Sequence, residues 1–502
     1  MSQLHIYNTL TRQLEPFVPM TPGQVRMYVC GMTTYDYCHI GHARAMMTFD
    51  VVYRWLKARG YDVTYVRNHT DVDDKIIARA NELGEHPLDL SARFIGYLDE
   101  DLAAIGLEVP THQPRVSEYI PEIVAMIQQL LDKGHAYVSD GDVYFSVETD
   151  PDYGKLSGRR REDLREGDQG DSGERKRSSA DFALWKGVKP GELDASWETA
   201  WGRGRPGWHI ECSAMAARLL GETFDIHGGG IDLVFPHHEN EIAQSECATG
   251  HKPFARTWMH NGHLTLEHTK MSKSLGNVVR IRDIVLEVPA EALRVLYLDS
   301  QYRSPLLYSS AKLEEAMVAL DRLYQARETL LEMAEQPEGD GVSALVASFG
   351  APAAELAEAV RTFDERFQEA MDDDFNTALA LGCLHELARA ANRLGNVKKA
   401  RKRASVLAKR ALAAMDMAGR VLGIGHRAPA EYFQEVRQKL LKSRGVAEAD
   451  VEAAVAARWQ ARAAKDWAEA DRVRDELVAL GVVLMDGADG TTWRMRVGGE
   501  AA

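Results

Sequence analysis

The sequence lacks the features that place a chain in or across a membrane. No uninterrupted apolar run reaches the roughly 18 residues that a bilayer-spanning helix needs. The first residues, MSQLHIYNTLTRQLEPF, do not show the charged and then apolar pattern of an export signal. We therefore expect a cytoplasmic protein with no membrane partner.

Cysteine is scarce and scattered. Only five cysteines occur in 502 residues, an odd number spread over the whole length. Disulfide-stabilised proteins are typically short and place an even number of cysteines at close spacing. This argues against a disulfide framework, and we expect reduced thiols or metal ligands instead.

An excess of positive charge is also missing. The formal net charge is -15, which by itself argues against a nucleic-acid partner, because phosphate contacts depend on Lys and Arg. Residues 392–410 differ, since they contain many bases and no acid. This stretch indicates either a solvated helix surface or a nucleic-acid contact, and it leaves both open.

A pattern of strands and helices is clearly present. Residues 25–29 and 62–66 are predicted to be short buried strands, and residues 43–56 between them a helix. At this spacing a right-handed crossover joins two parallel strands, and ligands bind at the carboxyl ends of such strands. Cys30 and His39 fall at such an end.

The chain is too long for one compact core. We expect an α/β fold: a Rossmann-like parallel-sheet catalytic domain with an insertion, then a helical bundle, then a small mixed α/β domain. The predicted division is residues 1–113 and 201–309 for the two halves of the catalytic domain, 114–200 for the insertion, 310–425 for the bundle and 426–502 for the C-terminal domain.

Shorter patterns make further predictions within this division. A helix is predicted around residues 120–133, and a hairpin in GHAYVSDGDVYFSV. FDIHGGGIDLVFP predicts a strand followed by a Gly-rich turn. A helical pair is predicted over residues 450–479, with a small hairpin after it. Residues 159–177 contain almost no apolar side chains and are predicted to form a mobile loop.

The segment His39-Ile40-Gly41-His42 places two imidazoles three residues apart. On a helix they share one face, and at a helix N-terminus they add side-chain donors to free backbone N–H groups, which suits a triphosphate. Histidines at a helix start are more often caps or surface residues, so the tetrapeptide alone is a weak signal. Its position after a predicted strand favours the triphosphate.

A second segment, Lys270-Met271-Ser272-Lys273-Ser274, holds two ammonium groups in a stretch rich in Ser and Gly. Such groups can follow the charge that develops on pyrophosphate as it leaves. The alternative is an ordinary surface loop. The two segments support each other, because an anion site in one half of the fold and a cationic loop in the other form a clamp for ATP.

With these motifs the chain resembles the class I aminoacyl-tRNA synthetases, and within them the cysteinyl-tRNA synthetases. The resemblance covers essentially the whole length and includes YVCGMTTYDYCHIGHARAM, RPGWHIECSAM, DIHGGGIDLVFPHHENEIAQS, TKMSKSLGN and KDWAEADRVRDELVALGVVLMDGADGTTWR. It implies a ligase that activates L-cysteine with ATP and transfers it to the 3′ end of tRNA(Cys). The implied catalytic residues are His39, His42, Lys270 and Lys273.

The resemblance also implies one zinc ion held by Cys30, Cys212, His237 and Glu241. His237 and Glu241 are four residues apart and therefore share a helical face, as two ligands of one tetrahedral site can. From the residues alone, His238 and Glu239 remain alternatives. A borderline-soft metal binds a thiolate far better than a hydroxyl, so it would separate cysteine from serine without editing.

Further positions are implied by the resemblance alone. Trp208 would close the amino-acid pocket, although it could also be a core residue. Gly31 and Thr70 would contact the backbone groups of cysteine. Gly230 and Asp232 would meet the ribose of the adenylate, although the glycine run is also compatible with a tight turn.

Two groups of residues have no assigned chemistry. The roles of three acids after the second predicted strand are open and include capping a helix: Asp71, Asp73 and Asp74. The remaining cysteines are expected to be buried thiols: Cys38, Cys247 and Cys383.

We expect a monomer whose partners are ATP, accompanied by Mg²⁺, L-cysteine and tRNA(Cys). The nearest rival is a ligase that joins activated cysteine to an amino-sugar acceptor. Such an enzyme needs no long helical extension, so residues 310–502 fit tRNA better. A catalytically silent RNA-binding or metal-storage relative is disfavoured, because both ATP motifs are intact.

Overall fold

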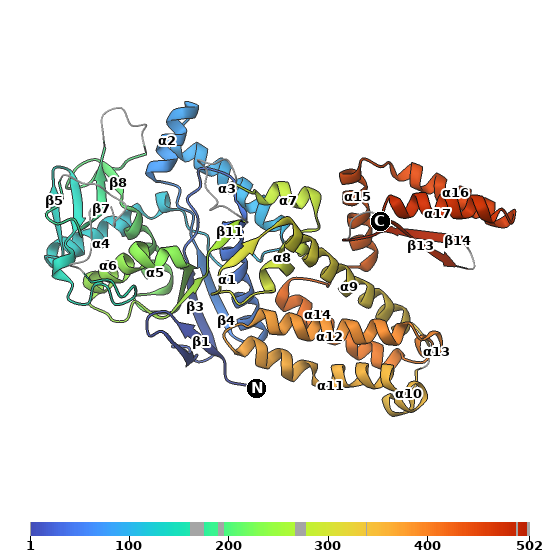
Figure 1. Ribbon diagram of the computed structural model, residues 1–502. Helices are drawn as coiled ribbons and strands as arrows, with labels where there is room; N and C mark the ends of the chain where they lie inside the picture. Colours follow the sequence, from blue (N-terminus) through green and yellow to red (C-terminus); the bar gives the residue numbers. More distant parts are fainter. Residues whose placement is uncertain are drawn as a thin grey trace.

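The computed structural model describes residues 2–160, 175–188, 195–266, 278–337, 339–487 and 490–498. A parallel sheet lies between the insertion at one end of the molecule and a helical bundle at the other, and a C-terminal lobe stands beside the bundle (Figure 1). Within the described ranges, no helix is both long and apolar enough to cross a membrane.

Four parallel strands form the central sheet, in the order β10-β9-β3-β4. As predicted, β3 (Gln24–Val29) and β4 (Asp62–Arg67) are joined by α1 (Ile40–Ala58). β9 (Phe224–Gly230) and β10 (Ala255–Asn261) extend the sheet beyond β3. The predicted α/β fold with a parallel sheet is confirmed, and the carboxyl end of β3 leads towards the N-terminus of α1.

The predicted Gly-rich turn in FDIHGGGIDLVFP is wrong, because the three glycines belong to β9 and pair with β10. A Cβ at Gly228 would lie 2.2 Å from the ring of Phe49 in α1, and a Cβ at Gly229 would lie 2.8 Å from the ring of His238. Glycine is required here by close packing against the strand. The turn follows at Ile231–Leu233.

The insertion contains an antiparallel sheet in the order β5-β6-β7-β8. The predicted hairpin is confirmed, since β5 (Ala136–Ser139) pairs with β6 (Asp142–Phe145). β7 (Phe182–Gly187) and β8 (Gly204–Pro206) complete the sheet. A single hydrophobic core joins this sheet to α4 (Ile120–Asp132) and to the helices beside the central sheet. Most of the predicted loop over residues 159–177 lies outside the described residues.

The other elements before the bundle position the site. The helices are α2 (Asp74–Leu83), α3 (Pro87–Ala104), α5 (Trp208–Leu220), α6 (Glu239–Thr249), α7 (Ile281–Glu287) and α8 (Ala290–Leu298). The strands are β1 (His5–Asn8), β2 (Gln13–Pro16), β11 (Leu264–Leu266) and β12 (Leu306–Tyr308). Short helical turns occupy Val116–Glu118, Val147–Thr149 and Val234–His238.

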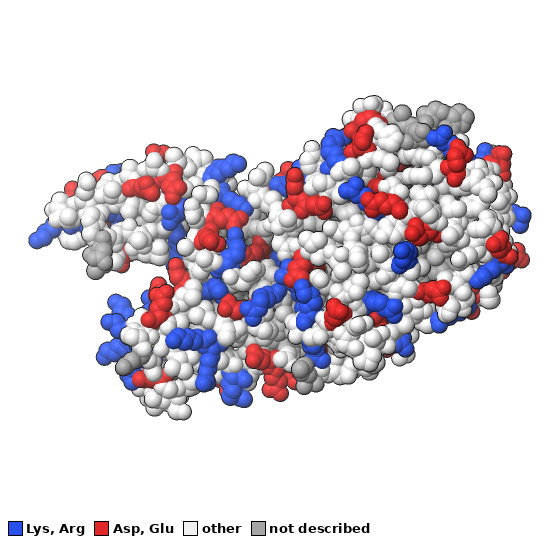
Figure 2. Space-filling view, turned by 180° about the vertical axis from the view of Figure 1, so that it is seen from behind, with Lys and Arg blue, Asp and Glu red and all other residues white. Residues whose placement is uncertain are grey.

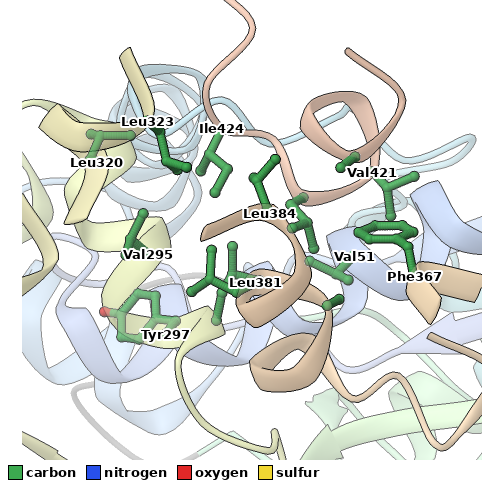
Figure 3. Close-up of a cluster of buried hydrophobic side chains, with 14 of the residues drawn as sticks. Val51, Val295, Tyr297, Leu320, Leu323, Phe367, Leu381, Leu384, Val421 and Ile424 are labelled. Atoms are coloured by element: carbon green, nitrogen blue, oxygen red, sulfur yellow. The ribbon is translucent and has the colours of Figure 1, made fainter. Parts of the chain in front are cut away.

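The bundle shares its core with the catalytic domain. Its helices are α9 (Ser310–Ala334), α10 (Val342–Phe349), α11 (Ala351–Asp372), α12 (Thr377–Gly395), α13 (Lys398–Arg401) and α14 (Ser405–Leu422). Val51 of α1 and Val295 of α8 belong to the same buried cluster as Leu323, Leu381 and Val421 of the bundle (Figure 3). Burial of this apolar surface holds α1 and the bundle together.

The C-terminal lobe begins with a helix that packs on the bundle. Tyr432 of α15 (Pro429–Arg444) is buried in the bundle core and stacks on Tyr324 of α9 at 3.9 Å between ring centroids. The predicted helical pair is α16 (Glu448–Ala463) and α17 (Trp467–Ala479), and the predicted hairpin is β13 (Val482–Gly487) and β14 (Gly490–Met495). These four elements enclose a small core of their own.

Candidate active site and metal centre

A cavity of about 430 Å³ opens at the carboxyl ends of β3, β9 and β10. Seven of the residues singled out in the sequence line it: Cys30, Gly31, His39, His42, Trp208, Gly230 and Asp232. They come from segments up to two hundred residues apart in the chain, and the sheet brings them to one edge. The cavity therefore lies where a parallel sheet binds its ligands.

His39 is the N-cap of α1 and precedes its first turn. Its Nδ1 accepts hydrogen bonds from the backbone N–H groups of Gly41 (3.1 Å) and His42 (3.4 Å). In the neutral ring the proton is then on Nε2, which can donate to a ligand. The rings of His39 and His42 stack at 3.6 Å between centroids. The pair lies where the helix dipole and first-turn N–H groups favour an anion.

After the segment that contains Lys270 and Lys273, the chain lies against the first turn of α1. The N–H of Ile40 donates to the carbonyl of Val279 at 3.1 Å. On the other side of the lysine segment, Leu264 lines the cavity. Lys270 and Lys273 lie outside the described residues, so their place in the site stays a prediction.

Four ligand atoms converge behind the cavity wall, from Cys30, Cys212, His237 and Glu241, all within 4.8 Å of one another. Cys30 Sγ lies 3.7 Å from Cys212 Sγ and 3.4 Å from Glu241 Oε1, and His237 Nε2 lies 3.1 Å from the same oxygen. Ligands about 2.0–2.3 Å from one tetrahedral ion are roughly 3.3–3.8 Å apart. The donor atoms and their spacing fit a single metal ion.

A second grouping shares two of these residues and adds His227 and His238. His227 Nε2 lies 2.8 Å from Glu241 Oε2, the oxygen that faces away from Cys30 and His237. His238 Nε2 lies 3.3 Å from Cys30 Sγ, and its Nδ1 lies 2.7 Å from His260. Both histidines thus touch atoms of the first grouping and can orient them.

Glu239, the other residue left open as a metal ligand, forms hydrogen bonds to the insertion instead. Its two carboxylate oxygens accept backbone N–H groups of Gly154, Leu156 and Ser157 at 2.7–3.3 Å. The side chain is buried and directed to this loop. It anchors residues 154–157 and contributes no atom to either grouping.

Burial penalises charge in the cluster, but neighbouring groups oppose the penalty. Burial alone would raise the pKa of Glu241, yet His227 and His237 hold it well below its usual range. Burial also opposes ionisation of Cys212, but hydrogen bonds from Cys30 and His237 lower the pKa of its thiol. The site therefore favours a carboxylate at Glu241 and a thiolate at Cys212, the forms that bind a cation.

Trp208 lies against His237, the histidine of the first ligand grouping. Its ring stacks on His237 at 4.3 Å between centroids, and 37% of the side chain is exposed, so it is not a core residue. Trp208 and Cys30 both line the cavity.

Gly31 and Thr70 are held by neighbouring strands. The N–H of Gly31 donates to Asn68 Oδ1 at 2.9 Å, and a Cβ at Gly31 would lie 1.7 Å from the carbonyl oxygen of Asn68. Glycine is therefore needed for the close approach of the β3 and β4 ends. Thr70 is buried, does not line the cavity, and donates its hydroxyl to Glu211 at 3.2 Å.

The sequence did not point to Arg44, which supports the cavity wall, or to Lys75, which lines the cavity. Arg44 is buried in α1 and donates to the backbone carbonyls of Gly262, His263, Tyr302 and Ser304. It holds the wall that contains His263, and an arginine on the buried face of a predicted helix was the available signal. Lys75, at the start of α2, also lines the cavity. A single lysine at a helix start carries no comparable signal.

Three acids whose roles the sequence left open have structural roles: Asp71, Asp73 and Asp74. Asp73 caps α2 by accepting the N–H of Lys75 at 2.8 Å, and Asp71 accepts the N–H of Ser117 at 3.0 Å. Asp74 forms ion pairs with Lys186 and Arg205 of the insertion sheet.

Cys38 and Cys383 are buried as predicted, but Cys247 is only half-buried, because the last turn of α6 lies near the surface.

Family models match three parts of the chain. Residues 16–318 match the tRNA synthetases class I (C) catalytic domain, and residues 366–426 match the DALR domain. Residues 444–494 match the cysteinyl-tRNA ligase anticodon binding domain.

Solved structures show the same fold at low sequence identity. Methionyl-tRNA synthetase of Mycobacterium tuberculosis, in complex with methionyl-adenylate, has a TM-score of 0.55 and 16% identity over 85% of this chain and 94% of its own. Leucyl-tRNA synthetase of Agrobacterium radiobacter has a TM-score of 0.58 and 11% identity over 84% and 86%. Together with the catalytic-domain match, the fold defines a class I aminoacyl-tRNA synthetase.

Curated relatives narrow this class. Cysteine–tRNA ligase of Geobacter sulfurreducens is 50% identical over 496 residues, which covers 98% of this chain and 100% of the relative. Cysteine–tRNA ligase of Pseudomonas aeruginosa is 52% identical over 496 residues, with 98% and 99% covered. The chain belongs to the cysteine–tRNA ligase family, and the family resemblance seen in the sequence is confirmed.

Proposed function

We propose that the protein activates L-cysteine with ATP and transfers the cysteinyl group to the 3′ end of tRNA(Cys). The observation that carries the proposal is a single cavity that joins the stacked pair His39 and His42 to Cys30 and Trp208, in a chain of this family. One side of the cavity suits a triphosphate and the other a thiol. No side chain needs to become a covalent nucleophile.

His39, His42, Lys270 and Lys273 are proposed to stabilise the charge that develops during adenylate formation. The cysteine carboxylate attacks the α-phosphate of ATP in line, and pyrophosphate is the leaving group. Gly230 and Asp232, at the end of β9, are proposed to contact the ribose. Positioning and electrostatic stabilisation account for most of the acceleration in such a reaction.

We assign the donor set of Cys30, Cys212, His237 and Glu241 to one zinc ion, because two thiolates suit a borderline-soft metal better than the grouping with a single cysteine. When bound, zinc would supply a site that accepts the thiolate of cysteine and rejects the hydroxyl of serine. His227 would orient Glu241 through Oε2. Gly31, which lines the cavity, is proposed to contact the backbone groups of cysteine, and Thr70 to support the cavity from behind through its hydrogen bond to Glu211.

Residues 310–425 and 426–502 are proposed to bind tRNA, and the enzyme is proposed to act as a monomer. The matches to a DALR domain and to an anticodon binding domain support this assignment. A ligase for a small amino-sugar acceptor would need neither region. The boundaries at residues 113, 200, 309 and 425 stay predictions, although the insertion sheet extends past residue 200 to β8.

The test is aminoacylation of tRNA by the purified protein with each amino acid in turn. We expect charging with cysteine and tRNA(Cys), and discrimination against serine of about 10⁴ or more in kcat/KM. Comparable charging with serine would overturn the role of the metal site. Transfer of cysteine to an amino sugar without tRNA charging would establish the rival activity.

A further inference from the structure

A pocket of about 500 Å³ lies on the outside of the bundle, between α9 and α12. Its lining combines two alanines with four polar side chains: Ala319, Arg322, His385, Ala388, Arg389 and Asn392. None of these residues belongs to the active-site cavity. Two guanidinium groups, an imidazole and an amide, without an acid, form a wall suited to an anion.

The two arginines of this pocket form no close ion pair with the described residues, although Arg322 lies near Asp321 and Arg389 near Glu386. Within the part of the chain that the structure describes, neither Arg322 nor Arg389 has a carboxylate at ion-pair distance. Arg393, one turn further along α12, is different, because it pairs with Glu355 at 2.6 Å. Within the basic stretch 392–410, other arginines are paired in the same way.

Charges of both signs lie near the imidazole of this pocket. Burial lowers the pKa of His385, Asp299 acts to raise it, and Arg389 and Arg322 act to lower it. The Asn392 amide donates to the backbone carbonyl of Arg322 at 3.3 Å, which ties α12 to α9 across the pocket. The site is thus held in shape by the bundle itself.

The pocket lies close to the C-terminal chain. Ala319 and Arg322 also line an adjoining hollow whose other wall includes Glu314, Glu315 and Gly498. The C-terminal lobe stands beside the bundle (Figure 1), and the view from behind shows a notch between the two, with Lys and Arg side chains on the bundle (Figure 2). The pocket therefore borders the end of the C-terminal lobe.

We propose that Arg322 and Arg389, with Asn392, bind a backbone phosphate of tRNA and so position it between the anticodon-binding lobe and the active site. The proposal rests on the proposed function, since tRNA is the ligand. Phosphate contacts fix the register of a nucleic acid without reading its sequence. The contact would therefore contribute affinity and orientation.

The test compares Arg322→Gln, Arg389→Gln and the double variant with Arg393→Gln, the paired arginine on the same helix. We expect the double variant to raise the tRNA KM and the binding Kd by about 10-fold or more at 0.1 M salt, with kcat for aminoacylation nearly unchanged. The slope of log K against log salt should fall by about one for each arginine lost. Arg393→Gln should change the tRNA KM less than about 2-fold.

ATP–pyrophosphate exchange with cysteine should be unchanged in all variants, and Arg389→Lys should recover part of the affinity because the charge is retained. Circular dichroism and the urea midpoint check that each variant is folded. A double variant with wild-type Kd and salt slope would overturn the proposal and leave the proposed function intact. A wild-type enzyme that charges no tRNA would instead overturn the function.

A last experiment uses inorganic phosphate as the probe. Phosphorus NMR line broadening measures the binding of millimolar phosphate to each protein. If phosphate binds the wild type but not the double variant, while the two have the same tRNA Kd, the pocket is a site for free phosphate and the tRNA contact is overturned. We expect phosphate to compete with tRNA in the wild type and to lose that effect in the double variant.

Discussion

Glu241 shows how one side chain at the site is set by its neighbours. Its Oε2 faces His227 at 2.8 Å, while Oε1 faces His237 at 3.1 Å. The carboxylate is fully buried, so its charge is tolerated only because both oxygens are occupied by favourable partners. A metal ligand in this position is already oriented before an ion binds.

Replacing Cys212 by Ser should reduce the zinc content of the purified enzyme to well below one ion per chain and raise the KM for cysteine, because a neutral hydroxyl is a poor substitute for a thiolate. Elemental analysis measures the zinc content. Cys247→Ser is the matched control, since Cys247 lies outside both ligand groupings and should keep its zinc. Full zinc content with an unchanged cysteine KM would remove Cys212 from the ligand set.

Replacing Gly228 by Ala should destabilise the catalytic domain by about 1–3 kcal/mol, because the new Cβ would meet the ring of Phe49. The urea midpoint is the measurement. Gly96→Ala, on the exposed face of α3 where a Cβ meets nothing within 4 Å, should be neutral or stabilising. Equal midpoints for the two variants would contradict the packing requirement at β9.

At the scale of elements, α1 connects the ATP motif to the bundle. Its N-cap is His39, and near its middle Asp50 pairs with Arg294 of α8 at 2.7 Å, with both side chains at most 2% exposed. Arg294 also donates to the carbonyl of Leu422, at the end of α14. Three helices are therefore joined at one buried charge pair.

Replacing Asp50 by Ala should destabilise this junction by about 3–5 kcal/mol, because it leaves the buried guanidinium of Arg294 without its counter-charge. Chemical denaturation measures the loss. Removing an exposed pair by Arg361→Ala should change the denaturation midpoint far less, since Arg361 and Glu358 are both solvent-accessible. Combining Asp50→Leu with Arg294→Met should recover much of the stability. A similar loss in Asp50→Ala and Arg361→Ala would show that the buried pair is not special.

At the scale of the whole molecule, the C-terminal lobe has two attachments of different strength. α15 is embedded in the bundle core through Tyr432 and Val436. The helical pair and hairpin after it enclose a second, small core with Leu441 of α15, and Trp493 is buried in it. A truncation that separates adenylate formation from tRNA recognition should therefore be made after α15.

Truncation after Gly445 should leave ATP–pyrophosphate exchange with cysteine within about 3-fold of the full chain, because the cavity and the bundle core are retained. Aminoacylation should fall by about 10² or more in kcat/KM, since remote contacts orient the reacting hydroxyl of tRNA. Both activities are measured on the same preparation. Efficient charging by the truncated enzyme would show that residues 446–502 do not read tRNA.

The sequence by itself determined what depends on short-range pattern. The period of apolar residues predicted α1, its flanking strands and both hairpins, because local geometry sets which residues share a face. The four-residue spacing of His237 and Glu241 placed both on one helical face for the same reason. The charge of residues 392–410 was equally visible, but the acids that pair with its arginines come from other helices.

Only the tertiary structure decided which distant residues meet. Cys30 and Cys212 are 182 residues apart in sequence, yet their sulfur atoms lie within 3.7 Å. Nothing local indicates which backbone carbonyls Arg44 would hold, that Thr70 would bond Glu211 and not line the cavity, or that Arg322 and Arg389 would share a pocket. These outcomes depend on how close-packed helices and strands fit together, which is a property of the whole chain and not of any segment.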